Sequence, residues 1–163
     1  MKQETVLKSL LREDVFFSPP FTVSELPHKA KLDQNEAPFD LPDDVKVLLL
    51  EKLKEYQWNR YPQPSVYANA KKAFAKAIGF PPENMILTMG GDQLIQGAYL
   101  IAGGHDRDAL IFEPTYPMFS HAAGFNQTKV TRIQLTAEKV PTKDHINKSG
   151  HHIIFIVAPN NPT

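Results

Sequence analysis

The fold is decided by the stretch Met85-Ile86-Leu87-Thr88-Met89-Gly90-Gly91-Asp92-Gln93-Leu94-Ile95. An apolar run of strand length leads into two glycines and an aspartate, and apolar residues at helical spacing follow as far as Ala102. The stretch therefore predicts a strand, a tight turn and a helix. The first amides of such a helix have no partner within the helix, and the helix dipole adds partial positive charge at the same place.

The turn at Gly90-Gly91 suits an anion such as a phosphate group. Neither glycine has a side chain that would obstruct an anion, and Asp92 can cap the helix or make a polar contact to whatever the phosphate carries. The alternative is a strand-to-helix turn that needs glycine only for its backbone. The glycine turn alone does not decide between the two interpretations.

Composition limits the kinds of partner. The 163 residues are 42% hydrophobic, which is enough for one ordinary core, so one domain or a domain and a part is expected. The 18 basic residues balance the 18 acidic residues, so no excess of charge indicates nucleic acid or an anionic membrane. The chain has no cysteine, which removes disulfides and thiolate metal sites. Charges interrupt the apolar pattern of residues 1–14, which therefore predict neither a signal peptide nor a membrane span, and the cytoplasm is the expected location.

Residues 1–31 are predicted to form an N-terminal arm. A short helix over residues 5–11 is followed by prolines that keep the chain extended. Such arms commonly lie on another part of the protein or on a partner subunit, and a loosely ordered terminus is the alternative. We expect residues 32–62 to be part of a small domain with a dimer-contact segment, and residues 63–163 to be the first part of a large domain.

Two amphipathic helices are predicted in the first half of the chain. The first begins at Pro42, has acidic residues in its first turn and ends near Tyr56, and its apolar face is expected to pack in a core. The second runs from Val66 to Ile78, with Ser65 as its N-cap and Gly79 at its end.

The second half of the chain predicts an α/β fold. Beyond the strand of the glycine turn, strands are expected at residues 109–112, 130–135 and 152–157, with a helix at 118–123. The last strand is a continuous apolar run, which indicates burial on both faces in a mostly parallel sheet with flanking helices. Ligands bind beyond the carboxyl ends of the strands in such sheets, and the glycine turn and two proline-rich segments all follow predicted strands. This convergence favours a binding site over a purely structural turn.

Four motifs together resemble a known family. They are Asn59-Arg60-Tyr61-Pro62, Gly90-Gly91-Asp92, Glu113-Pro114-Thr115-Tyr116-Pro117 and Ala158-Pro159-Asn160-Asn161-Pro162-Thr163. In this order and spacing, residues 30–163 resemble the N-terminal part of a fold-type-I aminotransferase that depends on pyridoxal phosphate, and are most similar to the histidinol-phosphate aminotransferases.

The resemblance implies a role for six residues. Gly91 and Asp92 match the turn that holds the cofactor phosphate, and Tyr116 matches the aromatic residue stacked on the pyridine ring. Asn161 matches the asparagine that donates to the cofactor's phenolic oxygen. Tyr61 matches the tyrosine that reaches the phosphate of the neighbouring subunit in a homodimer, and Asn35 lies in a segment that resembles the loop near the substrate carboxylate. Gln93 stands where the family most often has an acid.

The resemblance also implies catalytic groups that these residues do not include. A Schiff-base lysine, an aspartate at the pyridine nitrogen and an arginine for the substrate carboxylate all follow the Asn-Pro-Thr motif in this family. The lysines present, such as Lys129, Lys139, Lys143 and Lys148, match nothing catalytic. We therefore assign no catalytic residue, and expect the chain to be the N-terminal segment of a longer enzyme and to be inactive alone.

The expected reaction is transamination between histidinol phosphate and 2-oxoglutarate. Another aminotransferase, or a pyridoxal-phosphate decarboxylase of a phosphorylated amino acid, is an alternative within the same class. An alternative of another class is a non-catalytic module that binds a phosphorylated ligand through the glycine turn. We expect no metal site, because His151 and His152 open a predicted strand, where adjacent side chains point to opposite faces.

Overall fold

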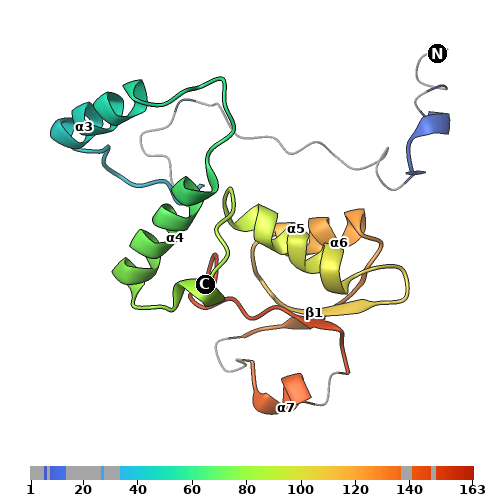
Figure 1. Cartoon of the computed structure of the whole chain (residues 1–163). Helices are drawn as coiled ribbons and strands as arrows, with labels where there is room; N and C mark the ends of the chain where they lie inside the picture. Colours follow the sequence, from blue (N-terminus) through green and yellow to red (C-terminus); the bar gives the residue numbers. More distant parts are fainter. Residues whose placement is uncertain (1–5, 7, 14–26, 28–33, 137–140, 148–149) are drawn as a thin grey trace. The chain divides into compact units, whose positions relative to one another are not determined.

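The computed structural model describes residues 6, 8–13, 27, 34–136, 141–147 and 150–163 (Figure 1). Contacts divide the chain into two units, with residues 1–19 and 87–163 in unit 1 and residues 20–86 in unit 2. Most of the predicted arm, and the first residues of the loop that contains Asn35, lie outside the described residues. The contact boundary follows Ile86 rather than Pro62, and the assignment of small and large domains stays a prediction.

Unit 1 is built on a three-stranded parallel sheet. Its strands are β1 (Asp108–Glu113), β2 (Lys129–Gln134) and β3 (Ile153–Ile154), in the order β2-β1-β3. Ala109 of β1 is paired with Val130 on one side and with Ile153 on the other. The structure therefore confirms the predicted α/β fold with a parallel sheet.

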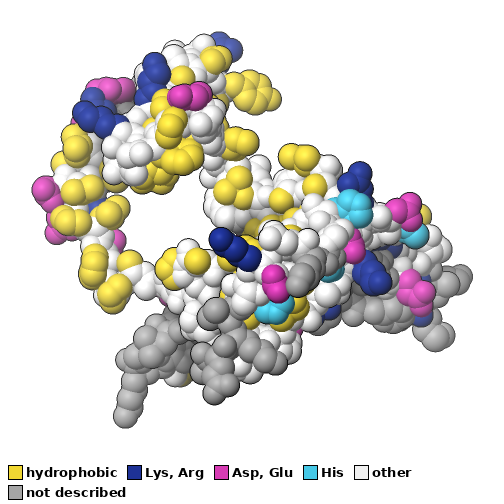
Figure 2. All heavy atoms as spheres, turned by 90° about the horizontal axis from the view of Figure 1, so that it is seen from below, with side chains coloured by type: hydrophobic (Ala, Val, Ile, Leu, Met, Phe, Trp, Pro, Cys, Tyr) yellow, Lys and Arg dark blue, Asp and Glu magenta, His cyan; other side chains and the backbone are white. Residues whose placement is uncertain are grey.

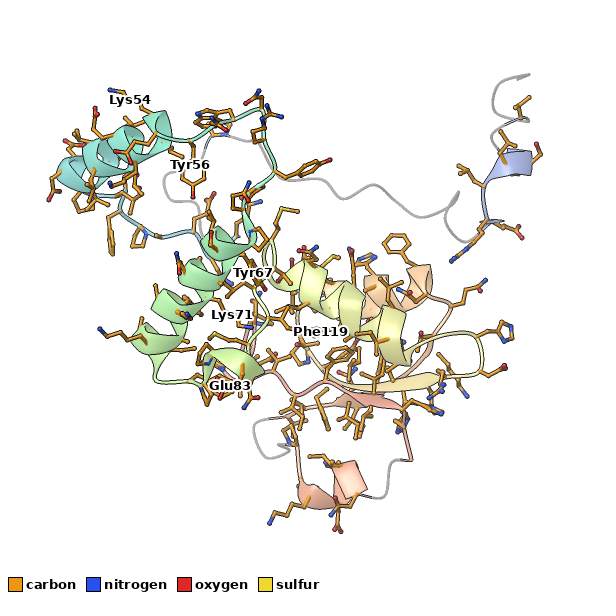
Figure 3. All side chains as sticks on the ribbon, viewed as in Figure 1. Lys54, Tyr56, Tyr67, Lys71, Glu83 and Phe119 are labelled. Atoms are coloured by element: carbon orange, nitrogen blue, oxygen red, sulfur yellow. The ribbon has the colours of Figure 1, made fainter. Side chains whose placement is uncertain are left out.

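Helices flank this sheet on both sides. In Figure 1, α5 (Gly91–Ala102) and α6 (Met118–Phe125) lie together over one face, and α7 (Lys143–Asn147) lies on the other side. Phe119 of α6, labelled in Figure 3, lies between the helices and the sheet, and its ring centroid is 4.7 Å from that of Phe155. The buried core is formed by Ile95, Tyr99, Ala109, Ile111, Phe119, Ala122 and Ala123.

Two predicted strands differ from the structure. Residues 85–88 form no strand, although Met85 is extended (φ −119°, ψ 138°), because both edges of β1 are already paired and no other described strand lies beside these residues. The strand predicted for residues 152–157 is only two residues long, and Ile156 is 52% exposed rather than buried. The sheet of the described residues thus has three strands instead of four.

The corner after α5 is tightly packed. A Cβ atom added at Gly103 would lie 2.5 Å from Thr128 Oγ1 and 2.6 Å from the carbonyl oxygen of Tyr99. The same Thr128 hydroxyl accepts a hydrogen bond from the Gly104 amide at 2.9 Å. This corner positions the connection that leads into β1.

The described part of the arm contacts α6. Residues 6 and 8–10 are helical, within the predicted helix at residues 5–11. The Arg12 guanidinium donates to the carbonyl oxygens of Phe125 (2.8 Å) and Gly124 (2.9 Å) at the end of α6. A cation at this place also complements the partial negative charge at the C-terminus of a helix.

Unit 2 consists of α3 (Asp43–Lys54), α4 (Pro64–Ile78) and the short 3-10 helix η1 (Pro82–Asn84). Both predicted helices are confirmed, but the N-cap of α4 is Gln63 and not Ser65, because Pro64 already begins the helix. Gly79 ends α4 in the left-handed conformation (φ 69°, ψ 36°), as predicted.

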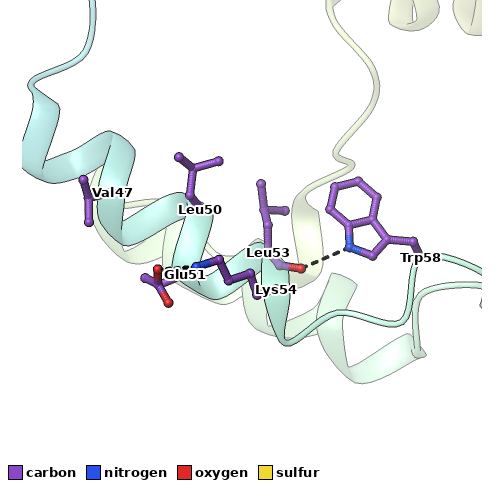
Figure 4. A pocket seen from close by; sticks show the side chains of 6 residues that line it. All are labelled: Val47, Leu50, Glu51, Leu53, Lys54 and Trp58. Carbon is purple, nitrogen blue, oxygen red and sulfur yellow. Dashed lines mark hydrogen bonds and ion pairs between the residues drawn. The ribbon is translucent and has the colours of Figure 1, made fainter.

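The apolar face of α3 is exposed, contrary to the expected core packing. Hydrophobic side chains are visible at the surface in Figure 2, and the α3 members are Val47, Leu48, Leu49, Leu50 and Leu53, between 42% and 59% exposed. Three of them line a mostly apolar hollow of about 370 Å³ together with Glu51, Lys54 and Trp58, namely Val47, Leu50 and Leu53 (Figure 4). The Trp58 indole donates to the Leu53 carbonyl oxygen at 3.2 Å. None of the described helices is long and apolar enough to cross a membrane.

Candidate cofactor site at the carboxyl ends of the strands

The glycine turn has the backbone that its sequence predicts. Gly90 precedes α5 with φ 81° and ψ 173°, a conformation that favours glycine, and the helix begins at Gly91. No side chain caps the first turn of α5, so Asp92 is not the helix cap. The Gln93 amide oxygen instead accepts a hydrogen bond from the Met89 amide at 2.8 Å. This hydrogen bond connects the residue before the two glycines to the first turn of α5.

The space at this turn fits a phosphate group. A Cβ atom added at Gly90 or at Gly91 would meet no atom of another segment within 4 Å, so the space beside these two Cα atoms is open. The amides at the start of α5 lack partners within the helix and carry its partial positive charge. Open space and amides that are not bonded within the helix are what an anion of this size requires.

The structure brings Tyr116 together with Asp92. Tyr116 follows β1, and its phenol lies near the Asp92 carboxylate at the start of α5. Burial of the phenol, followed by the nearby negatively charged Asp92 carboxylate, raises the pKa of Tyr116. The ring remains 36% exposed, and it meets Phe119 edge to face at 6.5 Å. Two residues predicted from separate motifs thus share one site.

Asn161 lies in the loop that follows β3. Its neighbour Asn160 accepts a hydrogen bond from the Thr115 hydroxyl at 2.8 Å and donates one to the Pro114 carbonyl oxygen at 2.7 Å. The loop with Asn161 is therefore fastened to the loop with Tyr116. Asn160 is a residue that the sequence reasoning did not assign, because its partners are more than forty positions away.

Glu113, at the end of β1, is held from the neighbouring strand. Its carboxylate accepts hydrogen bonds from Arg132 Nε and from Gln134 Nε2 of β2, both at 3.0 Å. Arg132 also donates to the Ser120 hydroxyl of α6 at 3.2 Å. These contacts fix the position at which the chain leaves the sheet toward Tyr116.

The other two predicted residues, Tyr61 and Asn35, belong to unit 2. Tyr61 is 94% exposed and is followed by Pro62. Asn35 is also exposed and adopts a positive φ of 53°. The roles of these two residues stay predictions.

The histidine pair differs from its prediction. His152 Nδ1 lies 2.7 Å from Asp108 Oδ1, and His151 Nε2 lies 3.9 Å from Asp108 Oδ2, so both rings approach the same carboxylate. Both residues precede β3, and therefore the alternation of side chains along a strand does not apply to them. The hydrogen bond with His152 is the main reason why the pKa of Asp108 is lowered. Among the residues that the structure describes, no three histidine or carboxylate side chains are grouped to hold a metal ion.

Curated relatives resemble most of this chain. It is 33% identical over 156 residues to a histidinol-phosphate aminotransferase of Thermococcus kodakarensis, an alignment that covers 94% of this chain and 46% of the relative. It is 35% identical over 140 residues to the histidinol-phosphate aminotransferase of Hydrogenobaculum sp., covering 84% of this chain and 40% of the relative. The chain thus spans less than half the length of these relatives.

Solved structures share the fold. A putative aminotransferase from Burkholderia pseudomallei superposes with a TM-score of 0.65 at 17% identity, over 80% of this chain and 39% of that one. Tyrosine aminotransferase from Leishmania infantum superposes with a TM-score of 0.55 at 20% identity, over 74% of this chain and 37% of that one.

The family model for aminotransferase class I and II matches residues 27–163, which include the glycine turn and both proline-rich loops. The chain belongs to the aminotransferase class I and II family.

Proposed function

We propose that the protein containing this chain is a pyridoxal-phosphate-dependent aminotransferase that transfers the amino group of histidinol phosphate to 2-oxoglutarate in histidine biosynthesis. The names of the curated relatives support the substrate. The main support for the proposal is that Asp92 lies near Tyr116, beside the open space at the glycine turn. A non-catalytic turn would require the glycines but not this phenol.

Each residue of the site has a role that its chemistry suits. The Gly91 amide and the start of α5 hold the phosphate, and the face of Tyr116 stacks on the pyridine ring. The Asp92 carboxylate lies near the phenol of Tyr116. The Asn161 amide donates to the phenolic oxygen of the cofactor and so favours its anionic form. The chemistry that pyridoxal phosphate supplies when bound is the temporary storage of an amino group and of electrons.

We further propose that the active protein is a homodimer in the cytoplasm. Tyr61 is almost fully exposed on a segment that Pro62 and Pro64 stiffen, which suits a phenol that serves the phosphate site of a second subunit. Asn35 is proposed to lie near the substrate carboxylate.

Cofactor titration of the full-length apoprotein tests the site. Asp92→Ala and Tyr116→Ala should each weaken pyridoxal phosphate binding by about 1 kcal/mol or more, because one loses the polar contact and the other loses ring stacking. The matched controls Asp106→Ala and Phe125→Ala remove an exposed carboxylate and an exposed ring elsewhere in unit 1 and should bind normally. Unchanged affinity in both site variants would refute the site, and full affinity without transamination of histidinol phosphate would refute the substrate.

Mixed dimers test the proposed role of Tyr61. Subunits with Tyr61→Phe are combined with subunits whose cofactor-binding lysine is replaced. If each site takes its tyrosine from one subunit and its lysine from the other, one site of the mixed dimer is intact and activity is partly recovered. Activity equal to the average of the two parents would show that Tyr61 acts within its own subunit.

A further inference from the structure

The Asn160 side chain makes three hydrogen bonds, and they leave its amide only one orientation. The carbonyl oxygen of Pro114 only accepts, so the atom that faces it at 2.7 Å must be Nδ2. The second hydrogen on Nδ2 is donated to the Thr163 hydroxyl oxygen at 2.7 Å. Oδ1 then accepts from the Thr115 hydroxyl at 2.8 Å. An aspartate at this position would have the same shape, but it would place a carboxylate oxygen opposite the Pro114 carbonyl oxygen, and both of these atoms only accept.

These contacts connect two loops that leave the same edge of the sheet. Strands β1 and β3 are parallel neighbours, so the loop after β1, with Tyr116, and the loop after β3, with Asn161, emerge side by side. Among the described residues, the hydrogen bonds between these two loops are both made by the Asn160 side chain. Side chains next to Asn160 on one loop and next to Thr115 on the other are the ones proposed to touch the cofactor.

The start of helix α5 is a third segment that lies beside these two loops, next to Tyr116. The Tyr116 phenol lies near the Asp92 carboxylate at the start of α5, and the neighbouring Thr115 is hydrogen-bonded to Asn160, so the start of α5, the β1 loop and the β3 loop lie close together. Glu113 holds the beginning of the β1 loop from β2. The segment after β3 is bonded to β1 through the Phe155 amide, which donates to the Leu110 carbonyl oxygen at 3.0 Å, and further along it Asn160 bonds the β1 loop.

We propose that Asn160 is a positioning residue, which fixes the distance between the stacking ring of Tyr116 and the amide of Asn161. This inference rests on the proposed function, because it assigns to Asn160 the spacing of two cofactor contacts. Loss of the Asn160 contacts frees the β3 loop, and Asn161 then donates less well to the phenolic oxygen of the cofactor. The bound cofactor should therefore take up a proton at higher pH than in the wild type.

Two variants and two controls separate positioning from stability. Asn160→Asp replaces both donors by acceptors at nearly constant shape, and Thr115→Val removes one hydroxyl at constant shape. Thr115→Ser keeps the hydroxyl and should restore wild-type behaviour. Asn126→Ala removes a side-chain amide that donates to the Ala122 carbonyl oxygen at the end of α6, so it controls for the loss of an asparagine side chain away from the site.

The measurement is the visible absorbance of the full-length protein with bound pyridoxal phosphate, titrated with pH, together with the cofactor dissociation constant. We expect Asn160→Asp and Thr115→Val to raise the midpoint of the absorbance titration by about half a pH unit or more. We expect the dissociation constant to rise about tenfold for Asn160→Asp. Thr115→Ser and Asn126→Ala should keep both wild-type values.

The outcomes distinguish this inference from the proposed function. If the wild type binds pyridoxal phosphate and Thr115→Val leaves the midpoint unchanged, Asn160 is not a positioning residue, although the proposed function stands. The same conclusion follows if Asn160→Asp and Thr115→Val lower only the melting temperature. If the wild type binds no pyridoxal phosphate, the proposed function is overturned and this inference with it.

Discussion

Strand β1 of unit 1 and helix α3 of unit 2 are both rich in large apolar residues, yet they bury them to very different extents. Leu110 and Ile111 of β1 are each 1% exposed, because strands flank both edges and helices cover the sheet. Leu48 and Leu50 of α3 are each 59% exposed. A central strand obtains its neighbours from its own unit, whereas the apolar face of α3 requires a surface that the described residues of unit 2 do not supply.

The largest expected effect comes from removing a side chain from the centre of unit 1. Ile111→Ala in the full-length protein should lower the free energy of unfolding by about 2–5 kcal/mol, because it leaves a cavity between the sheet and α5. Leu50→Ala is the matched change on α3 and should cost less than 1 kcal/mol if its side chain is as exposed as here. Chemical denaturation of both variants provides the comparison. An equal loss at Leu50 would show that another surface covers α3 in the full-length protein.

The second effect concerns Tyr99, a buried phenol in the core of unit 1. Its hydroxyl has no hydrogen-bond partner among the described residues, and burial raises the pKa of Tyr99 from 10.0 to about 12. The unfolded chain therefore loses the phenolic proton of Tyr99 at a lower pH than the folded chain does. The contribution of Tyr99 to the free energy of unfolding is fully present below pH 10 and falls by roughly 1.4 kcal/mol per pH unit up to pH 12. Tyr99→Phe should melt at the same or a higher temperature than the wild type at pH 7, with a difference that grows above pH 10.

Tyr56→Phe is the control for this measurement, because Tyr56 of unit 2 is 50% exposed. Melting temperatures recorded between pH 7 and pH 11 should be parallel for Tyr56→Phe and the wild type. Parallel curves for Tyr99→Phe as well would show that the Tyr99 phenol is hydrated or hydrogen-bonded in solution.

The smallest effect tests whether the arm belongs to unit 1. Arg12→Ala should lower the free energy of unfolding by about 1 kcal/mol, since it removes a cation and two hydrogen bonds from the C-terminus of α6. Arg12→Lys should retain part of this contribution, because the charge remains and the paired geometry is lost. Stability that does not change in Arg12→Ala would mean that the arm is not held at α6.

The sequence predicted elements whose signals are local. The glycines at positions 79 and 90, the spacing of α4 and the apolar run of β1 each describe a few consecutive residues, and the structure has these elements where they were expected. The strand expected at residues 85–88 depended on a neighbour, and apolar character alone does not supply one. The exposed face of α3 has the same explanation: periodicity predicts a helix and its apolar side but not what covers that side.

The candidate site was predictable to the same degree. The open glycine turn followed from its local sequence, and the sheet order explains why Tyr116 and Asn161 lie on neighbouring loops. Asn160 was missed, because its pairing with Thr115 arises only when β1 and β3 become neighbours. The signal available was an asparagine directly beside a predicted site residue, in a loop that needed a tether.

The corner at Gly103 has a consequence for how much variation the chain tolerates. Its backbone angles, φ −88° and ψ −170°, are open to any residue, so it is the crowding by Thr128 and by the Tyr99 carbonyl oxygen that excludes a side chain. Gly97, in the middle of α5, has open space where a Cβ would be. In a library of all single substitutions, position 97 should accept alanine and position 103 should reject it. A survey of tolerated variants would thus mark the corner between α5 and β1 as an invariant point, although it lies outside the proposed cofactor contacts.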